Sequence, residues 1–398
     1  ARGRELVQGC RNDTDKAGTL DVFMQEFSLS SREGVALMCL AEALLRVPDA
    51  DTADDLIAEK ILSGDWAEHR GQSESLFVNA STWGLMLTGR VVTLDTEITE
   101  TTDGWLKKLV SRVSEPVVRL AVSQAMKIMG QQYVLGRDID EALGRGRREN
   151  VPGTRFSFDM LGEGARTMKD ADSYFNAYLQ AIRTIGQLEH ADTVVEANGI
   201  SVKFSALHPR YEYLQAARVM SEMLPRVREL ALEAKKFGLG FTIDAEEADR
   251  LDISLDILEA LARDPELADW DGLGFVLQAY SKRAPLVVDW LVELGRDAGR
   301  RLMVRLVKGA YWDTEIKLAQ EEGYADYPVY TRKANTDLSY QVCASKLLQA
   351  QDAVYPQFAT HNAHTAALVL ELARGKQFEF QRLHGMGDLL HMQLAKGQ

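Results

Sequence analysis

The first 150 residues show apolar positions at the spacing that is typical of helices. In the segment SSREGVALMCLAEALLRVP, Ser30 and Glu33 form a capping pattern and Pro48 ends the stretch. The apolar stripe between them consists of Val35, Leu37, Leu40 and Leu44. This spacing predicts one amphipathic helix.

Two further helices are predicted over residues 52–62 and 114–130, each with a residue that can cap its amino end. The basic segment GRGRREN at 144–150 interrupts the apolar pattern, and we interpret it as a solvated linker in preference to a phosphate contact. Residues 1–150 are therefore predicted to be an all-α domain.

From residue 155 onward, short apolar runs rich in β-forming residues each precede a helical stretch. Seven such runs are predicted as strands: 155–163, 199–210, 240–250, 274–280, 304–313, 354–364 and 378–388. Between two of them, LDISLDILEALA places Leu251, Leu255 and Leu258 on one helical face. The next helix has Pro285 near its start and Gly299 near its end. Strands that alternate with helices indicate a parallel sheet with helical crossovers.

Polar residues gather at the carboxyl ends of the predicted strands. They are Glu163, Lys203, Asp244, Gln278, Arg305 with Lys308, His361 and His384. A βα-barrel places its active site at that end of all its strands, whereas an open doubly wound sheet concentrates ligands at one switch point. No G-x-G-x-x-G follows any strand, which also disfavours a nicotinamide dinucleotide fold. We predict an α/β fold with a (βα)8 TIM-type barrel over 151–398, preceded by the all-α domain.

Composition and charge exclude several other classes. The net charge of −13 and the pI of about 5.2 argue against a nucleic-acid partner, which needs clustered positive charge. No apolar run approaches the length of about 20 residues that spans a bilayer, and no secretory signal is evident. Three scattered cysteines show no metal-ligand spacing and fit a reducing compartment. We expect a cytoplasmic protein.

The polar ring offers cations, acids, an amide and aromatic side chains, a mixture that suits an anionic ligand with an aromatic head. Lys308 and the backbone of Gly309 are candidates for a phosphate, because glycine permits close approach and lysine supplies charge. Arg305 is the candidate for stabilising negative charge that develops on a flavin during reduction.

Several of these residues have simpler interpretations. Asp244 could cap the following helix, or it could form a structural ion pair with Lys203. His361 and His364 lack a matching carboxylate motif, so no metal site is expected. A different enzyme class is also open, an aldolase-like barrel in which Lys203 forms a Schiff base. A third alternative is a non-catalytic scaffold.

Long strings of the chain resemble a known family. FDMLGE, SVKFSALHPRY, IDAEEADRL, FVLQAY, RLVKGAYWD, PVYTRK, FATHNAH and LHGMG are similar, in order, to the strand-end motifs of the proline dehydrogenase barrel. Upstream, QEFSLSSREGVALMCLAEALLRVPD and SLFVNASTWGLMLTG resemble the helical arm and helical domain of the bifunctional bacterial proline-utilization flavoenzymes.

The resemblance implies roles for individual residues. The expected FAD site consists of Gln278, Arg305, Lys308, Gly309, Trp312, Thr331, Lys333 and His361. The expected proline site consists of Lys203, Asp244, Tyr311 and Leu383, with Glu163 in an ion-pair gate above it. Of these, Arg305, Asp244, Lys203 and Tyr311 are expected to take part in catalysis.

The implied reaction is the oxidation of L-proline to 1-pyrroline-5-carboxylate by hydride transfer from C5 to flavin N5. In the family, a membrane quinone then takes the electrons, which implies peripheral contact with the inner membrane. The family's amino-terminal DNA-binding domain, its aldehyde dehydrogenase half and its eighth strand find no counterpart in the motifs read here. That strand carries an Arg-Arg clamp for the proline carboxylate, so we expect a chain that ends at Gln398 to bind FAD poorly and to show little proline activity. We expect the full-length protein to carry the aldehyde dehydrogenase domain.

Overall fold

The computed structural model describes residues 2–13, 133–148, 153–162 and 164–396. The helices predicted over 30–48, 52–62 and 114–130 lie outside these residues. The chain divides into two compact units, one formed by residues 1–7 and 136–382 and the other by residues 8–135 and 383–398. The predicted boundary between residues 150 and 151 remains a prediction.

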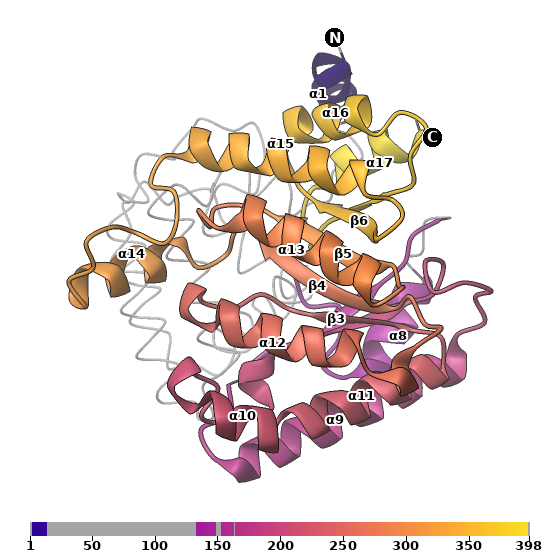
Figure 1. The fold of residues 1–398 in the computed structure, drawn as a ribbon. Coiled ribbons are helices and arrows are strands. Elements are labelled where there is room, and N and C mark those ends of the chain that lie inside the picture. The colour runs from indigo at the N-terminus through magenta and orange to yellow at the C-terminus, as the bar shows by residue number, and fades with distance from the viewer. Residues whose placement is uncertain (1, 14–132, 149–152, 163, 397–398) are drawn as a thin grey trace, which may run out of the picture. The chain divides into compact units, whose positions relative to one another are not determined.

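The first unit is built on seven parallel strands in the order β1-β2-β3-β4-β5-β6-β7 (Figure 1). The strands are β1 (Ser157–Asp159), β2 (Gly199–Val202), β3 (Gly240–Ile243), β4 (Leu273–Gln278), β5 (Leu302–Val307), β6 (Val354–Ala359) and β7 (Glu379–Gln381). Each of the seven predicted runs contains or overlaps one of these strands. The sheet is curled, so the prediction of an α/β barrel architecture is confirmed for seven of the eight strands.

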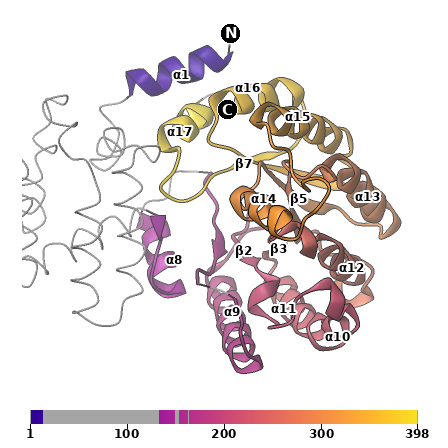
Figure 2. The same cartoon turned by 90° about the vertical axis from the view of Figure 1, so that its left-hand side faces the viewer.

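Helices follow the strands and cover the outer, convex face of the sheet (Figure 2). They are α9 (Met168–Leu188), α10 (Ala216–Glu222), α11 (Leu224–Lys236), α12 (Leu251–Ala262), α13 (Ala284–Asp297), α15 (Lys333–Gln349) and α16 (Ala363–Leu372). Two further helices lie apart from this layer: α8 (Ile139–Arg148) precedes β1, and α14 (Trp312–Glu321) follows β5 at the carboxyl ends of the strands. Short 3-10 helices cover Phe204–Ala206, Tyr213–Gln215, Ala248–Arg250 and Pro265–Leu267. Two helices include residues of the second unit, α1 (Arg2–Asn12) and α17 (Asp388–Lys396).

The apolar stripes of these helices form the core against the sheet. In α12, Leu258 is fully buried and Leu255 is nearly so, as the spacing predicted. The helix α13 has Pro285 in its first turn, and Gly299 adopts a φ of 63° just beyond its end. Burial of these stripes fixes the strands in one register.

The prediction of a solvated linker at 144–150 is wrong for Gly144–Arg148, because these residues form the last turns of α8. Acidic residues in the first turn and arginines in the last turn complement the helix dipole. Leu143 and Gly146 are buried, and Gly146 packs against the ring of Phe156. Local charge therefore stabilises a helix where composition alone suggested solvated coil.

In the second unit, the described residues include α17 and the end of α1. Gln393 Nε2 and Lys396 Nζ each contact Asp13 Oδ2 at 2.6 Å. This carboxylate therefore holds α17 against the residues that follow α1.

We predict that Gly186→Ala destabilises the fold by about 1–3 kcal/mol, because overpacking outweighs the gain in helix propensity. The new methyl would lie 2.5 Å from Phe237 Cβ and would clash with the ring. Gly144→Ala is the matched control, since only the Arg148 Nη1 atom, 3.9 Å away, lies near its added methyl. Urea unfolding measures both variants; a Gly186→Ala protein as stable as the parent would contradict the packing described here.

Candidate active site

The parallel register brings the side chains at alternate strand positions onto the concave face. In this register Arg305 of β5 is the partner of Val276 in β4 and of Gln357 in β6, and Gln357 is the partner of Glu379 in β7. Parallel strands present their carboxyl ends at one edge. Most of the predicted site residues gather at this end.

Lys203 follows β2 and lies between two carboxylates. Its Nζ atom is 2.7 Å from Asp159 Oδ2 and 2.9 Å from Asp244 Oδ2. Burial disfavours the charged ammonium, but the two aspartates outweigh this effect and raise the pKa of Lys203. The ion pair between Lys203 and Asp244 that the sequence left open is therefore present, and Lys203 remains protonated at neutral pH.

Arg305 extends from β5 across the concave face. Its Nη1 atom donates to Ser201 Oγ at 2.8 Å, and its Nη2 atom donates to Ser157 Oγ at 2.8 Å. Its Nε atom is buried and has no hydrogen-bond partner among the described residues. Burial lowers the pKa of Arg305, and the charges of Asp244, Asp159 and Glu379 oppose this shift. Since the ordinary pKa of an arginine lies far above neutral pH, the guanidinium keeps its charge.

Gln278, the last residue of β4, connects two loops at this end. Its Nε2 atom donates to the Glu246 carbonyl at 2.9 Å, and its Oε1 atom accepts from the Ala310 backbone N–H at 2.9 Å. Gly309 adopts a φ of 143°, and a Cβ there would overlap the ring of Tyr280. The backbone at 309–310 therefore requires glycine and lies exposed at the mouth of the sheet.

Lys308 and Lys333 both bind one carboxylate. Lys308 Nζ lies 2.5 Å from Asp337 Oδ1, and Lys333 Nζ lies 2.6 Å from Asp337 Oδ2. Although burial opposes it, the two lysines lower the pKa of Asp337. The three groups leave a net charge of +1 next to Gly309.

Two aromatic side chains complete this rim. Trp312 is 42% exposed, and its indole N–H donates to the Tyr330 carbonyl at 3.0 Å. Tyr311 is half-buried; burial raises its pKa to about 12, and the carboxylates of Glu246 and Asp244 add to the shift. Tyr311 therefore stays a neutral phenol at physiological pH.

The remaining predicted site residues are less closely tied to this group. Thr331 is exposed just before α15, and His361 is exposed just after β6. Leu383 belongs to the second unit, where it is 66% exposed. Glu163 lies outside the described residues. The predicted roles of these four residues remain predictions.

The sequence-based interpretation missed several polar residues of this site. They are Ser157, Asp159, Ser201, Asp337, Gln357 and Glu379. Glu379 Oε1 accepts from Gln357 Nε2 at 3.0 Å and from Gln381 Nε2 at 2.6 Å, and burial raises its pKa. Alternation within the strands was the available signal, because Ser157 and Asp159 occupy every second position of β1.

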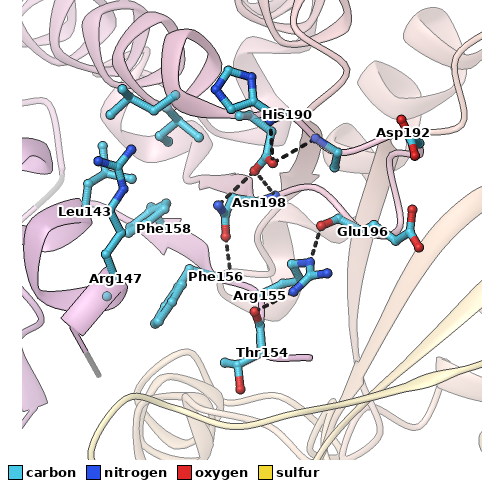
Figure 3. A pocket seen from close by; sticks show the side chains of 15 residues that line it. Leu143, Arg147, Thr154, Arg155, Phe156, Phe158, His190, Asp192, Glu196 and Asn198 are labelled. Atoms are coloured by element: carbon cyan, nitrogen blue, oxygen red, sulfur yellow. Dashed lines mark hydrogen bonds between the residues drawn. The ribbon is translucent and has the colours of Figure 1, made fainter. Parts of the chain in front are cut away.

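A cavity of about 390 Å³ lies elsewhere, between α8, α9 and the start of β1 (Figure 3). Leu143, Phe156 and Phe158 form part of its wall, and the carboxylate of Glu189 accepts hydrogen bonds from Asn198 beside it. None of the predicted site residues lines it. We place the candidate site at the carboxyl ends of the strands, where the ionised groups converge.

Within the described part of the chain, no group of three metal-ligating side chains is found. In the same residues, no helix is long and apolar enough to cross a bilayer.

Comparison with known proteins decides the family. Residues 142–398 match the family described as proline dehydrogenase. The chain belongs to the proline dehydrogenase family. Residues 19–133 match a second family, described as the DNA-binding domain of proline dehydrogenase. This match disagrees with our expectation that such a domain has no counterpart here. Because these residues lie outside the described ones, the expectation of no nucleic-acid partner remains a prediction.

Among curated members, the bifunctional protein PutA of Salmonella typhimurium is 53% identical over 395 residues, which are 98% of this chain and 30% of the relative. PutA of Rhizobium meliloti is 50% identical over 98% of this chain and 32% of its own length. The proline dehydrogenase 1 of Bacillus subtilis is 26% identical over 71% of this chain and 83% of its own length. This chain therefore spans about a third of the bifunctional relatives.

Solved structures agree with this assignment. The crystal structure of Bradyrhizobium japonicum proline utilization A is 52% identical, with a TM-score of 0.73, over 100% of this chain and 40% of that chain. The proline utilization A of Bdellovibrio bacteriovorus, at 22% identity, shares the fold with a TM-score of 0.72.

We predict that Lys203 resists Schiff-base formation, because its ammonium is held between two carboxylates. Incubation with a small aldehyde and borohydride at pH 8, followed by peptide mass spectrometry, should modify Lys203 at least about tenfold less than exposed lysines, since one pKa unit is a tenfold change in the neutral amine. Lys317 and Lys236, whose side chains are 75% and 66% exposed, are the internal controls. Preferential labelling of Lys203 would instead support the aldolase-like alternative.

Proposed function

We propose that this proline dehydrogenase family member oxidises L-proline to 1-pyrroline-5-carboxylate with FAD as its cofactor. The observation that carries the proposal is Arg305, a charged guanidinium that is held by two serine hydroxyls. Its buried Nε donor has no partner within the described parts of the chain. Such a group matches a ligand on which negative charge develops. The net positive charge of Lys308, Lys333 and Asp337 beside Gly309 agrees with an anionic organic cofactor.

Three observations support FAD binding by the residues of this site. The Nε atom of Arg305 needs an acceptor. The backbone at Gly309 is open to close approach, with the positive charge of Lys308 and Lys333 beside it. Trp312 presents an exposed ring. We assign Gln278 and Arg305 to the flavin ring, Lys308 and Gly309 to the pyrophosphate, and Trp312, Thr331, Lys333 and His361 to the remainder.

The chain's own residues would then orient and prepare proline. FAD, when bound, supplies the acceptor for the C5 hydride. Lys203 and Asp244, together with Tyr311 and Leu383, would bind the substrate, and Glu163 would contribute to a gate. Lys203 would help to fix the orientation of the substrate, since its own ammonium is held by Asp159 and Asp244.

Beyond the barrel, the proposal includes a quinone as the electron acceptor, peripheral contact with a membrane, and an aldehyde dehydrogenase domain in the longer protein. The PutA relatives are about three times longer than this chain, which supports a further domain. The visible absorption spectrum and proline-dependent dye reduction of the purified full-length protein test the proposal. A colourless, inactive protein would refute it.

Arg305→Met is expected to lower kcat by about 10²–10³-fold, because loss of one such charge costs about 2.7–4 kcal/mol of transition-state stabilisation. The flavin should also become harder to reduce. Arg296→Met is the matched control, because Arg296 is an exposed arginine of α13 that forms an ion pair with Asp352. Unchanged turnover and flavin potential in Arg305→Met would remove Arg305 from the mechanism.

Asp244→Ala is expected to reduce proline turnover by at least about tenfold, the range for loss of one positioned polar group, while FAD stays bound. The reason is that Asp244 contacts Lys203, which faces the substrate in this proposal. Flavin content per protein and steady-state kinetics measure the two effects separately. Loss of flavin would show instead that Asp244 has a structural role.

A further inference from the structure

Arg305 reaches hydroxyl groups on the opposite side of the curled sheet. In the strand order, β3 and β4 separate β5 from β2, and β1 lies one strand further away. The hydrogen bonds from Arg305 to Ser201 and Ser157 therefore cross the concave face. The two serine Oγ atoms lie 3.4 Å apart, so they form one acceptor surface for both Nη atoms.

These acceptors are neutral. No carboxylate lies within ion-pair distance of Arg305 among the residues that the structure describes. Of the nearby acids, Asp159 and Asp244 are both in contact with Lys203 Nζ, at 2.7 and 2.9 Å. The third, Glu379, accepts hydrogen bonds from Gln357 and Gln381. The guanidinium is therefore fixed in orientation without a direct counter-ion. A carboxylate in direct contact would oppose the effect of its charge on a ligand.

We infer that Ser157 and Ser201 are positioning residues for the oxidation reaction: their hydroxyls hold the Arg305 guanidinium across the barrel so that its charge and its free Nε donor face the cofactor. This inference rests on the proposed function. Without both hydroxyls, the guanidinium can turn to Asp159 or Asp244, and its charge is then partly neutralised where reduction requires it.

The test compares the flavin-loaded full-length protein with Ser157→Ala, Ser201→Ala and the double variant. Ser157→Thr keeps a hydroxyl and is the conservative rescue. Ser254→Ala is the matched control, because this buried serine donates to the Leu251 carbonyl at 2.7 Å within α12. Steady-state kinetics with proline and the flavin midpoint potential are measured for each protein.

We expect the double variant to lose about tenfold in kcat, with KM within about twofold of the parent, since an interaction made mainly in the transition state changes kcat. The flavin potential should fall by about 30 mV, which is a tenfold change for a two-electron couple. Each single alanine variant should lie between the parent and the double variant, while Ser157→Thr and Ser254→Ala should match the parent. A crystal structure of the double variant should place the guanidinium within 4 Å of a carboxylate.

Parental kcat and flavin potential in the double variant would overturn the inference and leave the proposed function intact. A parent protein that binds no flavin would overturn the proposed function, and the inference with it. If the double variant does not fold, Ser157→Ala and its threonine rescue decide the question, because Ser157→Ala removes only one of the two hydroxyls that bind Arg305. Equal potentials in these two variants would then overturn the inference.

Discussion

The ammonium of Lys203, held between Asp159 and Asp244, is the interaction on which the rest of the site depends. It joins the last residue of β1 to the residues that directly follow β2 and β3. It also occupies the two carboxylates that would otherwise attract Arg305. The same ion-pair cluster thus keeps Lys203 protonated, which disfavours Schiff-base chemistry. Among the residues that the structure describes, it also leaves Arg305 without a direct counter-ion.

A concave face with this many polar groups is costly unless each group is hydrogen-bonded. The structure satisfies most of them in pairs. Glu379 is held by Gln357 and Gln381, and Gln278 bridges two loops. The helices supply the compensating apolar burial on the convex face, where Leu258 and other core residues exclude water. The polar interior can therefore serve function because the outer layer carries stability.

The seven strands and the ion pair between Lys203 and Asp244 could be predicted from the sequence, because short β-rich runs and strand-end polar residues are local signals. The partners of Arg305 could not. Nothing in the sequence marks Ser157 and Ser201. They precede Arg305 by 148 and 104 positions, and only the curling of the sheet brings them into contact with it. Asp337 likewise lies in the first turns of a helix, where a solvated carboxylate is the ordinary expectation.

The segment Gly144–Arg148 was misassigned because its glycines and arginines suggest a linker. The charges at the two ends of α8, which complement the helix dipole, and the burial of Leu143 favour a helix instead.

The central claim is that this site transfers electrons from proline to a flavin beside Arg305. Anaerobic titration of the purified full-length protein with L-proline, followed by visible absorption, tests it most directly. The account predicts an oxidised flavin spectrum before the addition and stoichiometric bleaching of the flavin band by proline. A bound flavin that L-proline does not bleach, or a protein without a flavin spectrum, would contradict it.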